Sequence, residues 1–218
     1  MSIIILDAGS GETCRNDKAE VRRMIDGLAA VDSHRHQVYI KWQLFTKVPA
    51  PVPPLDHEVY VYAVRYAAER DYMTSASVFD EFQLSFLLGL REAGLPLPFV
   101  KLAARPRWYR LLEDIPRDVP VYLSLPNAAW RDCLTEMYPR AEPVRWLYCV
   151  PEYPANQTKY ETLFGGDLHY GISDHSPDLR LFKEYEPLYY ERHFMLPDST
   201  GLDAGPHAST PEQLAEIL

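Results

Sequence analysis

The chain has 218 residues, of which 47% are hydrophobic and 24% are charged. This length and composition suit one globular domain with a sizeable core, and they exclude a fibrous repeat or a disordered chain. The formal net charge is −9, and the charges are spread along the chain. This argues against nucleic acid as the main partner, because binding its phosphates requires a basic face. Local cations could still bind a small anion.

Three widely spaced cysteines, Cys14, Cys133 and Cys149, include no C-x-x-C pair. They indicate neither a zinc knuckle nor a disulfide framework, and we expect reduced thiols in a cytoplasmic protein. No segment approaches the roughly 18 apolar residues that span a bilayer. The first apolar run ends at Asp7 with no basic region before it, so it predicts a buried strand rather than a signal peptide, and no membrane partner is expected.

The amino-terminal half of the chain predicts three strands and three helices. In chain order, these are a strand over 3–7, a helix over 17–31, a strand over 37–45, a helix over roughly 56–70, a strand over 72–77 and a helix over 80–93. In the first helix, Val21, Met24, Ile25 and Leu28 recur at helical spacing. The proline-rich stretch from Pro49 to Pro54 predicts a loop, because proline cannot donate a hydrogen bond to a central strand or helix.

The carboxyl-terminal half continues the alternation with five further strands. In chain order, these segments are a strand over 99–103, a short helix near 107–114, a strand over 119–124, a helix over 128–137, a strand over 144–150, a weak helix over 157–164, and strands over 168–173 and 188–194. A last helix opens at Thr210, which suits an N-cap, with Pro211 in its first turn, and is cut off at Leu218.

Eight strands separated by helical or irregular sequence predict right-handed crossovers and a parallel sheet. Doubly wound sheets show the same alternation with fewer strands, whereas eight strands close a barrel. We therefore predict one domain over residues 1–218, an α/β fold of the parallel (β/α)8 TIM-barrel class with a truncated last helix.

Polar side chains gather at the carboxyl ends of the expected strands, where a barrel places its active site. These side chains are Asp7, Lys41, Gln43, Ser77, Lys101, Ser124, Glu152, Ser173, Asp174, His175, Glu191 and His193. Such a set of lysines, hydroxyls, carboxylates and imidazoles is richer than a purely structural barrel mouth requires. It predicts a polar site at this end.

Two motifs in the last two strands resemble the N-acetylneuraminate (sialic acid) synthase family. The segment GISDHS, residues 171–176, is similar to the family's G-Y-S-D-H-T, and ERHF, residues 191–194, followed by Leu196, is similar to its E-K-H-F-x-L. Weaker matches follow the family's order over nearly the whole chain. They are DAG at 7–9, KWQLF at 41–45, KLA at 101–103, VYLS at 121–124, the Cys149–Pro154 segment, and GLDA at 201–204 with the Ser209–Leu214 segment.

The resemblance implies a specific chemistry. Family members condense phosphoenolpyruvate with an N-acyl amino-sugar aldehyde and release phosphate, assisted by a divalent metal such as Mn²⁺ or Mg²⁺. His175 and His193 are the implied metal ligands, and Lys41 and Lys101 would hold the carboxylate and phosphate of phosphoenolpyruvate. Further expected substrate-binding residues are Gln43, Ser77, Arg105, Ser124, Ser173 and Asp174. The candidate acid–base residues are Asp7, Glu152 and Glu191.

The sequence also departs from the family pattern. After the fourth strand, Ala104, Arg105 and Pro106 stand where the family has S-G-E, so a hydroxyl and a carboxylate are missing, although Arg105 could serve as a phosphate ligand. After the sixth strand, Pro151 replaces an asparagine or serine. The resemblance stops before the family's small antifreeze-like domain, so an oligomer is possible but not of the family's domain-swapped type.

Each expected role has an alternative. The lysines could form structural ion pairs with Asp7 or Glu191, the histidines could be satisfied by ordinary hydrogen bonds, and Asp174 could cap or orient a neighbour. His207 is a weaker third metal candidate. For the whole chain, the alternatives to the synthase are a diverged barrel that binds a ligand or a protein partner, and a sugar isomerase or epimerase.

Overall fold

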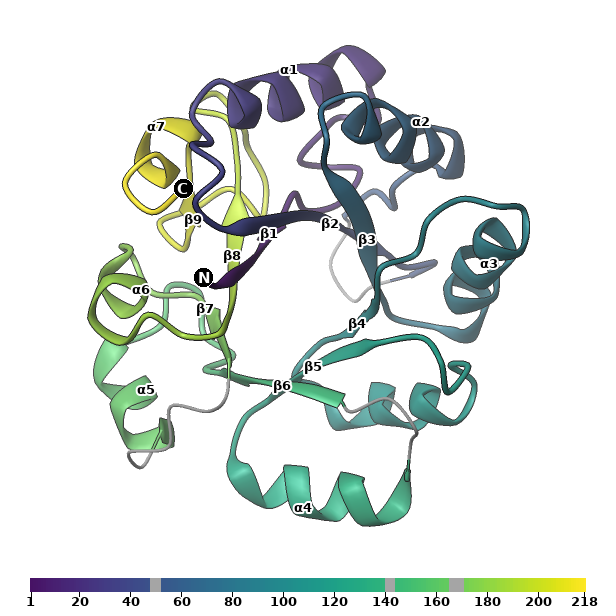
Figure 1. The fold of residues 1–218 in the computed structure, drawn as a ribbon, viewed down its shortest axis with the longest axis vertical. Helices are drawn as coiled ribbons and strands as arrows, with labels where there is room; N and C mark the ends of the chain where they lie inside the picture. The colour runs from purple at the N-terminus through teal and green to yellow at the C-terminus, as the bar shows by residue number, and fades with distance from the viewer. Residues whose placement is uncertain (48–51, 140–143, 165–170) are drawn as a thin grey trace.

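The computed structural model describes residues 1–47, 52–139, 144–164 and 171–218. Within these ranges, eight parallel strands form a closed barrel (Figure 1). The strands are β1 (Ile3–Asp7), β2 (Gln37–Leu44), β3 (Met73–Val78), β4 (Val100–Leu102), β5 (Val121–Leu125), β6 (Val144–Cys149), β7 (Gly171–Asp174) and β8 (Tyr189–Phe194). Each strand pairs with the next, and β1 pairs with both β2 and β8, which closes the sheet. This closure confirms the predicted (β/α)8 class.

Helices surround the barrel (Figure 1). They are α1 (Lys18–Ala29), α2 (His57–Ala68), α3 (Glu81–Glu92), the 3-10 helix η1 (Pro106–Glu113), α4 (Ala128–Met137), α5 (Gln157–Phe164), α6 (Arg180–Tyr185) and α7 (Pro211–Leu214). A capping box between Thr210 and Gln213 starts α7, as the predicted N-cap requires. None of the described helices is long and apolar enough to cross a membrane.

Two elements were not predicted. The six-residue helix α6 and the two-residue strand β9 (Ala208–Ser209), which pairs with the end of β8, are too short to show a hydrophobic period in the sequence. The expected strand over 119–124 begins at Val121 instead. Residues 168–170 of the seventh expected strand, and Pro49–Pro51 of the expected loop, lie outside the described residues.

The interior of the barrel changes from apolar to polar along its axis. Successive strand residues point to opposite faces, and one set packs against the helices while the other fills the barrel. The filling begins at the amino-terminal end with a buried apolar layer. This layer consists of Ile5, Tyr39, Phe99, Tyr122 and Leu147. Two positions further along their strands lie Asp7, Lys41, Lys101, Ser124 and Cys149, so the strand period places the polar side chains directly above this layer.

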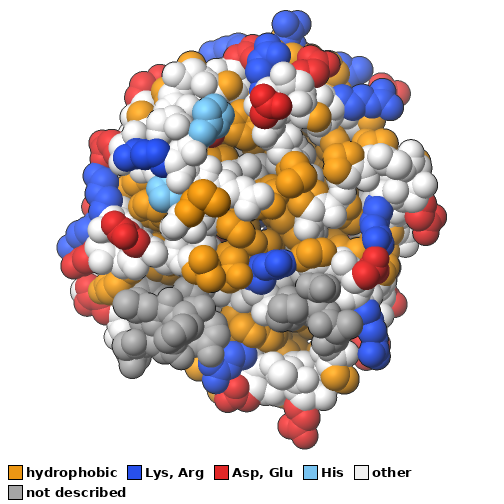
Figure 2. Space-filling view, viewed as in Figure 1, with side chains coloured by type: hydrophobic (Ala, Val, Ile, Leu, Met, Phe, Trp, Pro, Cys, Tyr) orange, Lys and Arg blue, Asp and Glu red, His pale blue; other side chains and the backbone are white. Residues whose placement is uncertain are grey.

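The surface at the amino-terminal end of the barrel is mostly apolar, although Gln37 and Arg145 line part of a groove there. The same groove is lined by Ile3, Pro98 and Tyr122, and Figure 2 shows hydrophobic side chains gathered over the middle of this face. The polar groups of the barrel interior are therefore reached from the carboxyl end.

Candidate functional site

The carboxyl ends of the strands open into a cavity of about 480 Å³. Almost every residue that the sequence singled out lines it. These residues are Asp7, Lys41, Gln43, Ser77, Lys101, Arg105, Ser124, Ser173, Asp174, His175, Glu191 and His193. The structure therefore brings residues from the ends of seven strands, together with Arg105, into one cavity.

Glu152 lies apart from them. Strand β6 ends at Cys149, and the chain then turns outward, so that Glu152 is exposed and pairs with Lys159 of α5. The cavity wall is formed instead by its neighbours Pro151 and Tyr153. A carboxylate in this position does not face the groups at the base of the cavity.

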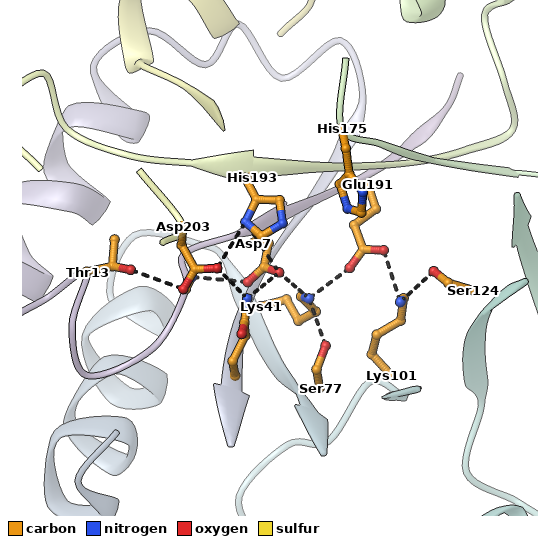
Figure 3. A network of polar contacts seen from close by, with 12 residues as sticks. Asp7, Thr13, Lys41, Ser77, Lys101, Ser124, His175, Glu191, His193 and Asp203 are labelled. Atoms are coloured by element: carbon orange, nitrogen blue, oxygen red, sulfur yellow. Dashed lines mark hydrogen bonds and ion pairs between the residues drawn. The ribbon is translucent and has the colours of Figure 1, made fainter. Parts of the chain in front are cut away.

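Lys41 stands at the centre of a buried polar network (Figure 3). Its Nζ atom lies 2.6 Å from Asp7 Oδ2, 2.8 Å from Glu191 Oε1 and 2.7 Å from Ser77 Oγ. Burial alone would lower the pKa of this ammonium group, but the Asp7 and Glu191 carboxylates outweigh burial and raise it. Lys41 is therefore firmly charged.

Lys101 shares the Glu191 carboxylate. Its Nζ atom lies 3.1 Å from Glu191 Oε2 and 2.8 Å from Ser124 Oγ (Figure 3). Burial lowers the pKa of Lys101, and neighbouring Lys41 lowers it further, against the opposing effect of Glu191. For Glu191, burial acts to raise the pKa, but the two lysines reverse this effect and hold the pKa well below its usual range. The ion pairs anticipated as the alternative role of the lysines are present.

His175 is held at both its ring and its backbone. Its Nδ1 atom lies 2.9 Å from the Val150 carbonyl oxygen, so this nitrogen carries the hydrogen and the Nε2 lone pair is left open. Its backbone N–H donates to the Tyr160 hydroxyl at 3.0 Å, and that hydroxyl donates to the Ser173 carbonyl at 2.7 Å. Burial lowers the pKa of the imidazole to about 4, so it is neutral at pH 7.

His193 faces two carboxylates. Its Nδ1 atom lies 3.5 Å from Asp203 Oδ1 and 3.8 Å from Asp7 Oδ2, and is buried without a hydrogen-bond partner among the described residues. Burial lowers its pKa to about 3, against the opposing effect of Asp7. The ring centroids of His175 and His193 are 5.4 Å apart. The site thus holds two neutral, neighbouring imidazoles.

These two rings have the chemistry of metal ligands. Neutral imidazole is the ligating form, and both rings line the same cavity. Fixing Nδ1 by a carbonyl group is the usual way to aim Nε2 at a metal. Among the described residues, no group of three or more His, Cys, Asp or Glu side chains could hold a metal, so the two imidazoles are the candidate ligands without a third side chain of these types.

Asp174 is enclosed by other contacts. Its carboxylate accepts hydrogen bonds from the Tyr190 hydroxyl at 2.6 Å and the Ser176 backbone N–H at 2.7 Å, and lies 3.4 Å from Arg192. This arrangement fits the alternative role of Asp174, in which it orients the strand end that carries His175.

Several residues of the site were not singled out from the sequence. Asp203 accepts a hydrogen bond from Gln43 at 3.0 Å, and burial, followed by the nearby Asp7, raises its pKa to about 7. The Tyr153 ring stacks on His175 with a centroid distance of 4.2 Å. Both lie in segments that resemble sialic acid synthase motifs, Asp203 in GLDA and Tyr153 before Pro154, and this resemblance is the signal that could have identified them.

Replacing Tyr160 with phenylalanine is expected to lower the free energy of unfolding by about 1–3 kcal/mol, because it leaves the buried Ser173 carbonyl and His175 N–H without their shared hydroxyl. Urea denaturation followed by circular dichroism measures this change. Tyr62→Phe, on a partly buried ring of α2 that stacks on Tyr66, is the control and should change stability by less than about 0.5 kcal/mol. Equal stabilities of the two variants would show that Tyr160 does not hold the strand end.

Comparison with known proteins finds solved structures with a similar fold. No family model matches the chain, and no curated protein matches it significantly. A sialic acid synthetase from Leptospira borgpetersenii, solved with citrate, is 22% identical with a TM-score of 0.76, over 98% of this chain and 80% of that one.

Two further solved structures are similar. A putative spore coat polysaccharide biosynthesis protein E from Chromobacterium violaceum is 18% identical with a TM-score of 0.76, over 99% of this chain and 72% of that one. The corresponding protein from Bacillus subtilis is 20% identical with a TM-score of 0.70, over 99% of this chain and 65% of that one. At the level of the fold, this chain is a barrel like those of sialic acid synthetase and the spore coat polysaccharide proteins.

Proposed function

We propose that this barrel is a metal-dependent synthase or lyase that resembles sialic acid synthase. It would condense phosphoenolpyruvate with an amino-sugar or another aldehyde, add water and release phosphate. The observation that carries the proposal is the convergence of two buried lysines, two serine hydroxyls and two neutral imidazoles in one cavity. The similarity to sugar-acid synthase barrels supports the same reaction class.

The residues of the chain suit distinct tasks in this reaction. Lys41 and Lys101 offer charged donors to an anionic substrate, and Ser77 and Ser124 fix their positions. A Mn²⁺ or Mg²⁺ ion bound at His175 and His193 would supply Lewis-acid polarisation of the aldehyde oxygen.

Asp203 is the best-placed group for proton transfer. Its pKa of about 7 lets its carboxyl group hold or release a proton at neutral pH, which is the range that general acid–base catalysis requires. It lines the cavity beside His193, so a proton held there faces the space in which a substrate would bind.

A second candidate function is supported by the cavity wall. Ala104 and Pro151 line the cavity where synthases resembling this chain are expected to offer polar donors, and both lysines are already paired with carboxylates. These features favour a diverged barrel that binds a ligand or a protein partner without catalysis.

A calorimetric titration with Mn²⁺, with and without phosphoenolpyruvate, separates the two functions. The enzyme should bind each ligand more tightly in the presence of the other, because coupling between two sites is reciprocal, and should release phosphate when a suitable aldehyde is added. If neither ligand binds, the synthase proposal is wrong and the diverged barrel is favoured.

A further inference from the structure

The two buried lysines at the base of the cavity are already paired with carboxylates. Two ammonium groups, Lys41 and Lys101, face two carboxylates, Asp7 and Glu191, at distances of 2.6–3.1 Å. A dianionic phosphate group placed here would have to compete with carboxylates that already occupy the lysines.

The rim of the same cavity is different. Arg105 and Arg107 both line the cavity and both are exposed. Within the part of the chain that the structure describes, neither guanidinium has an ion pair with a carboxylate. Arg110, which lies in η1 together with Arg107, differs from these two arginines. Its Nη2 atom lies 2.5 Å from Glu81 Oε1, and it does not line the cavity. The rim therefore carries two cations that are available to a ligand.

An aromatic wall holds one of these cations in place. The Arg107 guanidinium lies over the Trp108 ring at 4.4 Å from its centroid. Trp108 packs edge-on against Phe79, and Phe79 against Phe45, and the two phenylalanines line the cavity. Arg107 thus extends an existing wall of the site, which reduces the entropy lost when a ligand is bound.

The second cation belongs to the residue directly before η1. Arg105 has extended backbone angles, and Pro106 starts the 3-10 helix η1 directly after it. Between these arginines and Lys101, the cavity is lined by the small side chains of Ala103 and Ala104. This leaves room for an anion with no competing polar group from these two residues.

We infer that Arg105 and Arg107 form a rim subsite for a phosphate monoester, so that the phosphate group of the substrate binds at the rim rather than between the buried lysines. This assignment deepens the proposed function, on which it rests for the identity of the substrate. Guanidinium groups match phosphate oxygens with paired, charge-assisted hydrogen bonds. The lysines at the base then bind the carboxylate of the substrate, which is smaller and less charged than its phosphate group.

The test compares three ligands, namely inorganic phosphate, phosphoenolpyruvate and pyruvate, by calorimetry without metal. Wild type is compared with the double variant Arg105→Gln/Arg107→Gln and with Arg110→Gln as the matched control. The double variant should bind phosphate and phosphoenolpyruvate about tenfold more weakly or worse, with pyruvate affinity unchanged. Arg110→Gln should behave as wild type, and thermal melts should show that all three proteins are folded.

The two proposals can fail separately. Phosphate binding that depends on the two arginines, without any coupling between Mn²⁺ and phosphoenolpyruvate, supports the rim subsite and contradicts the synthase. Coupled binding that is unaffected in the double variant supports the synthase and overturns the rim subsite. Absence of phosphate binding in wild type, or equal losses in the double variant and Arg110→Gln, also overturns it.

Discussion

Glu191→Gln is expected to lower the free energy of unfolding by about 3–5 kcal/mol, because removing one partner of a buried ion pair leaves the other charge uncompensated. Glu191 is the only carboxylate that Lys101 reaches among the described residues, and it also contacts Lys41. The side chains of both lysines are only 3% exposed, so water cannot replace the lost charge. Urea denaturation of the purified variant at pH 7 measures the change.

The pH dependence of stability gives a second readout of the same residue. The pKa of Glu191 is lower in the folded protein than its unfolded value of about 4.3. Its contribution to stability is therefore complete above about pH 4.3 and declines as the pH falls further. Glu191→Gln should lose this part of the acid dependence, and the stability difference between the two proteins should shrink below pH 4.

Glu152→Gln is the matched control for this prediction. Glu152 is an exposed carboxylate paired with Lys159, and exposed pairs contribute about 0–1 kcal/mol. Equal losses of stability in the Glu152 and Glu191 variants would show that the buried network does not carry the expected energy.

The fold could be predicted because its signals are local and repeated. Runs such as Ile3–Asp7 and Val121–Leu125 are short, apolar and separated by amphipathic segments, and eight of them are sufficient to close a sheet. Helix α6 and strand β9 could not be predicted in this way. Their positions depend on contacts with β8 and with the helix layer, such as the buried Phe182 against Tyr190, which no short sequence window contains.

The position of the site followed from the strand ends, but the partners within it did not. The two-residue alternation of side chains along a strand places Lys41, Lys101 and Glu191 inside the barrel. It does not show that one carboxylate contacts both lysines. Glu152 follows β6 closely in sequence, yet the turn after Cys149 directs it to solvent. Asp203 lies in a loop beyond the barrel strands. It accepts a hydrogen bond from Gln43 although the two residues are 160 positions apart in the sequence, so only the tertiary structure reveals this contact.

His175→Ala is expected to weaken Mn²⁺ binding by more than the roughly 10- to 100-fold that is typical of losing an outer-shell partner, because it removes one of the two imidazoles that we propose as ligands. His193→Ala should have the same effect, since the two rings lie 5.4 Å apart and face one cavity. Calorimetry with Mn²⁺ alone measures both variants, and circular dichroism confirms that they are folded. His34→Ala, which removes an exposed imidazole, is the control and should bind as wild type does.

The pH profile of Mn²⁺ binding distinguishes these buried imidazoles from ordinary ones. A histidine with the usual pKa of about 6.5 loses affinity for metal as the pH falls through that value, because protons compete for the ligating nitrogen. Burial lowers the pKa of His175 to about 4 and that of His193 to about 3. Affinity for Mn²⁺ should therefore be maintained from pH 7.5 to about pH 5 and fall only below that. A decline centred near pH 6.5, or unchanged binding in both alanine variants, would place the ion on other residues.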